Sequence, residues 1–195
     1  MTRPLFVIKV SGSLYDLPDL GPRLQRWLSL PELADGNVLL VPGGGRTADV
    51  VRSLDSIHHL GEDRSHWLAL RSLTLNAHFL AELLPARLAD DPLCLSEKGH
   101  RLWLLDAHAF AVLDERRHEA GTLPHCWALT SDSIAVRAAL VGKAIRLVLL
   151  KSVTIPNGLD WSEAGRRGFV DEMFATILSG SQLRVDVVNF RAWSA

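Results

Sequence analysis

The sequence predicts an α/β fold: a three-layer αβα sandwich with a mostly parallel central sheet. Short aliphatic runs without polar alternation, such as Leu5–Val10 (LFVIKV), are typical of strands that are buried on both faces. The segments between these runs carry apolar residues at steps of three and four, which is the spacing of one helix face. A chain of 195 residues without a linker-like segment predicts one domain, spanning 1–195.

The N-terminal part alternates strands and helices. The strand Leu5–Val10 ends before Gly12, and Pro18 is well placed to open an amphipathic helix. A second buried strand, Asn37–Val41, runs into three consecutive glycines.

The glycines lead into two helices. We expect Thr47 to cap the first helix. Its apolar face consists of Val50, Val51, Leu54 and Ile57. The second helix is long and continues to Pro85, with Leu70, Leu73, Ala77, Leu80 and Leu84 recurring at steps of three and four.

The C-terminal half repeats the alternation. The predicted strands are Arg101–Leu105, a short Trp127–Leu129, Ile145–Leu150 and Leu183–Asn189. The predicted helices are Asp106–Arg116, Ser131–Lys143 and Val170–Leu178, the last ending before Gly180.

Composition excludes several classes of protein. The 21 Lys and Arg against 22 Asp and Glu give a net charge of −1, and no basic run marks a nucleic-acid or membrane surface. The two cysteines, Cys94 and Cys126, cannot form a disulfide framework. Because nothing in the sequence resembles a signal peptide or a membrane span, we expect a cytoplasmic protein.

The first strand ends in a polar segment that could bind an anion. Lys9 lies inside an otherwise apolar strand and is costly to bury unless an anion meets it. Gly12 permits close backbone approach, and Ser11 and Ser13 can donate hydrogen bonds. A structural explanation is equally good at this point: Lys9 reaches solvent at an edge and Gly12 simply turns the chain.

The second strand ends in Gly43, Gly44 and Gly45. Glycines between a strand and a helix leave the backbone N–H groups accessible, so the loop could bind an anion. A tight turn between the two elements is the structural alternative. Gly43, Gly45 and Ala48 also fit the G-x-G-x-x-[GA] dinucleotide pattern. The match is weak, because the loop follows the second strand and the acids about 20 residues on do not follow a strand.

The third candidate segment combines Thr130-Ser131-Asp132-Ser133 with Lys151 and Ser152. An aspartate in the first turn of a helix is ordinary capping chemistry, but Lys151 repeats the arrangement of Lys9 at a second strand end. Two lysines, a glycine loop and one acid provide the positive potential that phosphoryl transfer requires. No Walker A motif is present, and the eight histidines show no metal-ligand spacing. His125, just before this segment, could contact substrate, although a structural role is favoured.

Taken in order, these segments resemble the amino acid kinase superfamily. Lys9–Ser13 is similar to its Lys-x-Gly-Gly/Ser phosphate loop, Val41–Gly45 to its second-strand glycine loop, and Thr130–Ala135 to its Asn-Ala-Asp-like element. The short length, together with Val170-Asp171 and Phe174, is most similar to the (aminomethyl)furanmethanol phosphate kinase group of methanofuran biosynthesis. The resemblance implies the amino acid kinase fold, with a shortened C-terminal nucleotide-binding part, because the longer subdomain and Leu-Thr-Asp motif of larger members are missing.

The resemblance also implies an ATP- and Mg²⁺-dependent kinase that phosphorylates a small phosphate monoester or carboxylate. The implied catalytic residues are Lys9, Asp132 and Lys151, with Asp132 orienting the lysines or meeting Mg²⁺. The implied nucleotide-binding residues are Lys9, Gly12, Ser13, Lys151 and Ser152. The implied acceptor-binding residues are Gly43, Gly44, Gly45, Thr130, Ser131 and Asp171, of which Asp171 has the least support.

Two other functions fit the same residues. A non-catalytic nucleotide- or anion-binding protein would need the same loops, and an oxidoreductase could use Gly43–Ala48 to bind a dinucleotide. Apolar helix faces would also allow a homo-oligomer, although they serve a core equally well.

Overall fold

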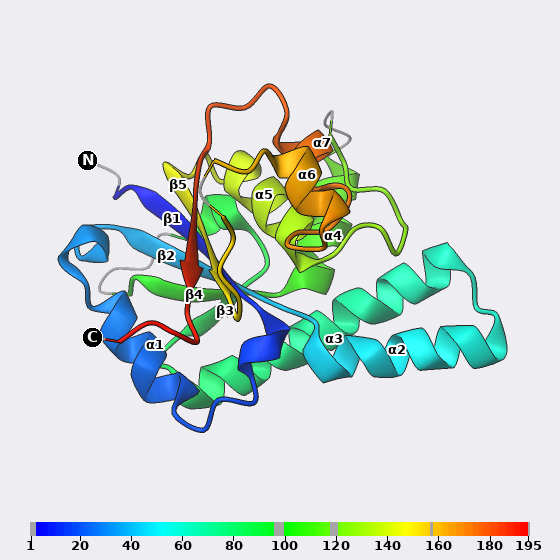
Figure 1. The fold of residues 1–195 in the computed structure, drawn as a ribbon, viewed down its shortest axis with the longest axis horizontal. Coiled ribbons are helices and arrows are strands. Elements are labelled where there is room, and N and C mark those ends of the chain that lie inside the picture. The colour runs from blue at the N-terminus through cyan, green and yellow to red at the C-terminus, as the bar shows by residue number, and fades with distance from the viewer. Residues whose placement is uncertain (1–2, 96–99, 118–120, 157, 195) are drawn as a thin grey trace.

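A six-stranded sheet forms the centre of the fold, in the order β3-β4-β2-β1-β5-β6 (Figure 1). Every neighbouring pair of strands is parallel. The computed structural model describes residues 3–95, 100–117, 121–156 and 158–194. The strands are β1 Leu5–Val10, β2 Asn37–Pro42, β3 Arg87–Ala89, β4 Leu102–Leu105, β5 Arg146–Lys151 and β6 Arg184–Asn189.

Helices cover both faces of the sheet, which confirms the predicted three-layer architecture. They are α1 Leu20–Leu28, α2 Gly45–His58, α3 Glu62–Leu83, α4 Ala107–Arg116, α5 Ser131–Val141, α6 Trp161–Arg166 and α7 Phe174–Leu178. One core cluster packs α4, α5, α6 and α7 on one face, and a second packs α1 on the other. The long helix α3 contributes Leu70 and Leu73 to the first cluster and Ala77 and Leu80 to the second.

Most predicted elements are confirmed, but the last predicted helix begins at Phe174 instead of Val170, and two further predictions are wrong. Trp127–Leu129 lies in a turn and loop instead of a strand. Thr47 does not cap α2, because the helix already begins at Gly45 and the threonine hydroxyl donates to the carbonyl of Gly44 at 2.6 Å. The edge strand β3 was not predicted, since its three residues are short and partly exposed and carry no alternating pattern.

The apolar face of α2 is mostly exposed to solvent. Of its four residues only Val51 is buried, whereas Val50 is 59% exposed, Leu54 42% and Ile57 68%. The reason is that α2 packs along α3, and the two helices extend together from the sheet (Figure 1). Leu75 and Phe79 of α3 are also exposed, so apolar surface occurs on both helices.

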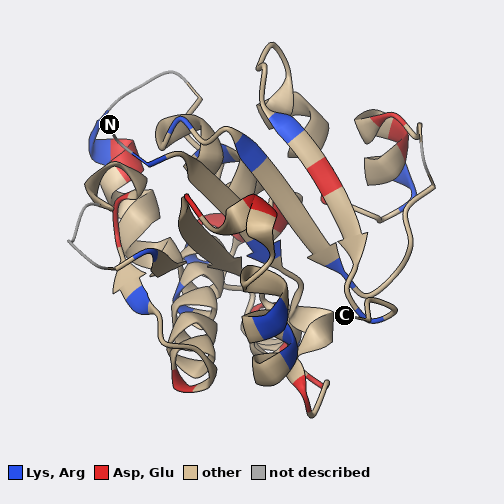
Figure 2. Ribbon diagram, turned by 90° about the vertical axis from the view of Figure 1, so that its left-hand side faces the viewer, with Lys and Arg blue, Asp and Glu red and all other residues tan. Residues whose placement is uncertain are grey.

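Figure 2 shows that the Lys and Arg positions and the Asp and Glu positions are mixed along the strands and helices of the ribbon. Within the described residues, no helix is long and apolar enough to cross a bilayer.

Candidate active site

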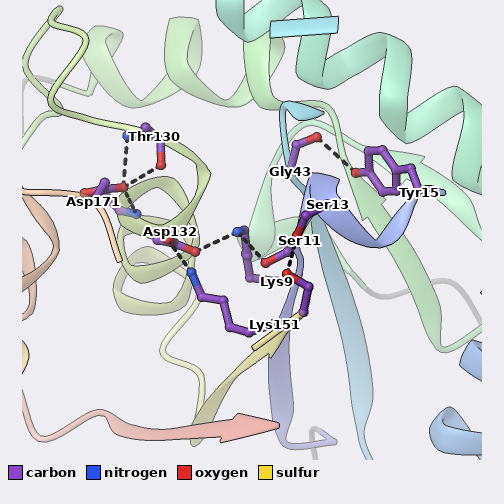
Figure 3. Close-up of polar contacts among 11 residues, drawn as sticks. Lys9, Ser11, Ser13, Tyr15, Gly43, Thr130, Asp132, Lys151 and Asp171 are labelled. Carbon is purple, nitrogen blue, oxygen red and sulfur yellow. Dashed lines mark hydrogen bonds and ion pairs between the residues drawn. The ribbon is translucent and has the colours of Figure 1, made fainter. Parts of the chain in front are cut away.

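Strand alternation brings the two strand-end lysines to one face of the sheet. Side chains two residues apart in a strand share a face, and Val7 and Leu149 both belong to the core cluster under α5. Lys9 and Lys151 follow them by two residues on neighbouring parallel strands, β1 and β5. Both lysines therefore point toward the N-terminal end of α5, where Asp132 lies (Figure 3).

The two lysines converge on the carboxylate of Asp132. Nζ of Lys9 lies 2.8 Å from Oδ1 of Asp132, and Nζ of Lys151 donates to Oδ2 at 2.6 Å. Lys9 also donates to Oγ of Ser11 at 3.0 Å. All three charged side chains are buried. Two ammonium groups against one carboxylate leave one positive charge uncompensated, and a buried charge of this kind favours an anionic ligand.

The charge cluster shifts the pKa values of its members. Burial raises the pKa of Asp132, but the two ammonium groups outweigh burial and hold it below its usual range. Burial, and then repulsion from Lys9, lower the pKa of Lys151 to about 8, although Asp132 opposes this shift.

The lowered pKa of Lys151 predicts a pH dependence. We expect kcat/KM for ATP to fall as pH rises through about 8, because the free enzyme then loses the Lys151 ammonium. In a Lys151→Arg variant the guanidinium stays charged, so this descending limb should move to higher pH. A pH profile of initial rates for both proteins tests the assignment. An unchanged limb in the arginine variant would assign the titration to another group.

The glycines allow the ends of β1 and β2 to pack in contact. A Cβ on Gly12 would lie 2.2 Å from the amide nitrogen of Gly45, and one on Gly43 would lie 2.3 Å from that of Gly12. Gly45 also has a φ of +53°, which favours glycine. Close packing therefore explains these glycines structurally. It also leaves the N–H groups of the first turn of α2, which have no partner within their helix, next to Lys9.

Two residues that the sequence analysis missed hold the glycine loop. The side-chain amide of Asn76, on α3, donates to the carbonyls of Gly43 and Gly44 at 2.7 and 2.8 Å. The hydroxyl of Tyr15 donates to the Gly43 carbonyl at 3.0 Å (Figure 3). With its carbonyls so occupied, the loop can turn its N–H groups toward a ligand. An asparagine beside the apolar positions of a helix was the available signal for Asn76.

Asp171 holds the start of α5. Its carboxylate accepts hydrogen bonds from N–H and Oγ1 of Thr130, both at 2.9 Å, and from N–H of Ser133 at 2.9 Å (Figure 3). The Ser133 hydroxyl makes a fourth contact. Asp171 therefore positions the helix that carries Asp132. Contact between Asp171 and a substrate stays a prediction.

A cavity of about 310 Å³ opens next to Lys9. Its polar end is lined by Lys9, Ser11, Gly12, Ser13, Gly44, Gly45, Thr130 and Ser131. Its apolar walls are Ala48, Ala69, Leu70, Leu73, Leu129 and Ile134. Four further residues with polar or aromatic side chains complete the lining: Asp49, Arg52, His66 and Trp127.

Not every predicted site residue reaches the cavity. Asp132 and Lys151 lie outside its lining and connect to it through Lys9. Ser152 lies outside as well, and its hydroxyl accepts a hydrogen bond from Ser13 at 2.9 Å. Gly43 is also absent from the lining, and its N–H donates to the carbonyl of Val10.

Among the described residues, no group of three or more His, Cys, Asp or Glu side chains could hold a metal ion. Asp132 does not fit a direct Mg²⁺ ligand, because each of its oxygens already lies within 3 Å of a lysine ammonium.

Comparison with known proteins agrees with this geometry. No protein-family model matches the chain. The chain is 25% identical over 202 residues to a [5-(aminomethyl)furan-3-yl]methyl phosphate kinase from Methanocaldococcus jannaschii, covering 96% of this chain and 88% of the relative. Among solved structures, it is similar to uridylate kinase from Archaeoglobus fulgidus, with a TM-score of 0.63, 18% identity and coverage of 95% and 90% of the two chains.

A UMP kinase from Ureaplasma parvum gives a TM-score of 0.64 at 12% identity, with 96% of this chain and 90% of that chain covered. These likenesses confirm the predicted fold. Together with the sequence relative, they make the chain similar, in sequence and in fold, to phosphotransferases of the amino acid kinase superfamily.

Proposed function

We propose that the chain transfers the γ-phosphoryl group of ATP to a small phosphate monoester, so that the acceptor becomes a diphosphate. The proposed acceptor is [5-(aminomethyl)furan-3-yl]methyl phosphate, the compound in the relative's name. One observation carries the proposal: the buried, uncompensated positive charge of Lys9, Lys151 and Asp132 lies beside a cavity with apolar walls. The charge suits a phosphate, and the walls suit the ring attached to it.

The six apolar wall residues suit a ring that needs few hydrogen-bond partners, such as a furan. The lining also contains Asp49, Arg52 and His66, whose polar side chains can serve other groups of a ligand. The choice of a furan phosphate over a nucleotide such as UMP therefore follows the sequence relative.

The proposed roles follow the positions of the residues. Lys9 and Lys151 would stabilise the transferred phosphoryl group, and Asp132 would hold both ammonium groups in place. Gly12 and Ser13, with Ser152 behind them, would face the donor phosphates. Gly44 and Gly45, with Gly43 supporting them, would hold the acceptor phosphate together with Thr130 and Ser131.

A phosphate acceptor requires no general base. Its second pKa is about 6, so most of it is ionised at neutral pH. The barrier arises from bringing two anions together, and fixed ammonium and N–H groups reduce it without reorganising. We propose that Mg²⁺ enters with ATP, bound to its phosphates, since the described carboxylates do not form a site for it.

An acceptor assay tests the function. Mg·ATP and the furan phosphate should yield ADP in proportion to acceptor, with ³¹P NMR showing the two coupled signals of a diphosphate. UMP is the matched comparison. Turnover of UMP in place of the furan phosphate would contradict the proposed acceptor. Thermal stabilisation by Mg·ATP without turnover of any acceptor would instead favour the non-catalytic binding protein.

We further propose that two copies associate through the exposed apolar residues of α2 and α3. Exposed apolar patches on helices commonly mark interfaces, and twofold pairs are the commonest oligomers. A Leu54→Glu variant should therefore give a smaller species than the wild type in light scattering after size-exclusion chromatography. A wild-type protein of monomer mass, or an unchanged mass in the variant, would contradict the interface.

A further inference from the structure

His66 is a buried histidine that the reaction described above does not use. It lies on α3 and is only 5% exposed, and it lines the cavity together with Lys9 and the glycine loop. In the part of the chain that the structure describes, neither ring nitrogen of His66 has a hydrogen-bond partner. The nitrogens are not among the fully buried atoms that lack a partner, so the ring keeps some access at the cavity that it lines. A ligand in the cavity could provide the missing hydrogen bond.

The surroundings of His66 hold its ring in place. The ring stacks on His125, with 4.6 Å between centroids and 14° between planes, and meets the edge of Trp67 at 5.7 Å. His125 is itself fixed, with Nδ1 2.6 Å from a carboxylate oxygen of Asp63 and Nε2 in contact with Glu115. The imidazole of His66 therefore presents a fixed edge to the cavity.

The protonation state of His66 defines what its ring can do. Burial, and then repulsion from His125, lower the pKa of His66 to about 4, so its ring is neutral and one nitrogen can accept a hydrogen bond. Burial lowers the pKa of His125, but Asp63 and Glu115 outweigh it and raise the pKa. The amino group of the proposed acceptor is a donor that such a nitrogen can meet.

We propose that His66 accepts a hydrogen bond from an ammonium group at the end of the acceptor remote from its phosphate, and so makes the enzyme selective for an aminated acceptor. The inference rests on the proposed function, because the acceptor phosphate must lie at the glycine loop. The cavity then has two recognition ends: an anion is bound near Lys9, and a cation is bound at His66.

The test compares two acceptors that differ at one group. One is [5-(aminomethyl)furan-3-yl]methyl phosphate, and the other carries a methyl group in place of the aminomethyl group. Dissociation constants are measured by calorimetry without ATP, and kcat/KM by ADP release. We expect the wild type to prefer the aminated phosphate by about tenfold or more, the size expected for a hydrogen bond to a charged group.

His66→Phe keeps the stacked ring and removes the nitrogens, so the preference should fall to about threefold or less. His66→Leu gives the same comparison if phenylalanine does not fit. His108→Phe is the matched control, because His108 also packs against Trp67, at 5.6 Å, but does not line the cavity. This control should keep the wild-type preference.

The outcomes separate the inference from the proposed function. A wild type without the preference, or a preference that survives in both His66 variants, overturns the role of His66. If both phosphates bind with the expected ratio but neither is phosphorylated, the proposed function fails and the role of His66 stands. If neither phosphate binds, both the proposed function and the role of His66 are contradicted.

Discussion

Lys9→Met should lower kcat by about 100-fold, the usual effect of removing one donor that stabilises transition-state charge. Methionine keeps most of the volume of the buried stem, so the change removes the ammonium group and little packing. The remaining Lys151 and Asp132 still form a pair of opposite charges at 2.6 Å. Because the uncompensated positive charge is lost with Lys9, we expect the thermal midpoint to stay the same or rise.

The loss of activity without loss of stability is the informative result. Steady-state kinetics with Mg·ATP and the furan phosphate, together with a calorimetric melt, measure both. Lys143→Met is the matched control, since Lys143 is exposed beyond the end of α5 and belongs to neither the cluster nor the cavity. Near-normal turnover in Lys9→Met would remove this lysine from the mechanism.

The convergence of the lysines follows from local sequence features. Parallel buried strands were evident as aliphatic runs, and the lysines occupy the same face as Val7 and Leu149 by simple alternation. The glycines mark a place where two strand ends touch. These features depend only on the two-residue alternation of a strand and on the backbone freedom of glycine. Both can be recognised in a short stretch of sequence.

The distal end of the cavity depends on contacts between distant residues. His66 becomes a buried wall residue because α3 packs beside α2 and because His125, 59 positions later, stacks on it. Trp127 reaches the same wall from a turn, with its indole nitrogen donating to Asp55 at 2.7 Å. Likewise, the spacing of apolar residues along α2 gives the helix an apolar face. The spacing alone does not indicate whether that face packs on the sheet or is exposed to solvent.

Asp132→Asn should destabilise the protein, in contrast to Lys9→Met. The asparagine is nearly the same size but leaves two buried ammonium groups without a carboxylate, and removing one partner of a buried ion pair costs about 3–5 kcal/mol. We expect activity to fall as well, since the lysines lose the group that positions them. Both changes follow from charge, because Asp132 lies after the N-cap Thr130 and makes no capping bond.

The pH dependence distinguishes this mechanism from a general packing defect. Lys151 already has a pKa lowered to about 8, and in Asp132→Asn it loses the carboxylate that opposes this shift, so its pKa should fall further and the folded variant should bind fewer protons than the folded wild type. Stability rises with pH wherever the unfolded state binds more protons, so the deficit relative to wild type should shrink as pH rises toward about 8, where Lys151 becomes neutral in the wild type as well. Urea unfolding at several pH values measures this slope. A deficit independent of pH would mean that Asp132 acts through packing and that its charge does not hold the two lysines.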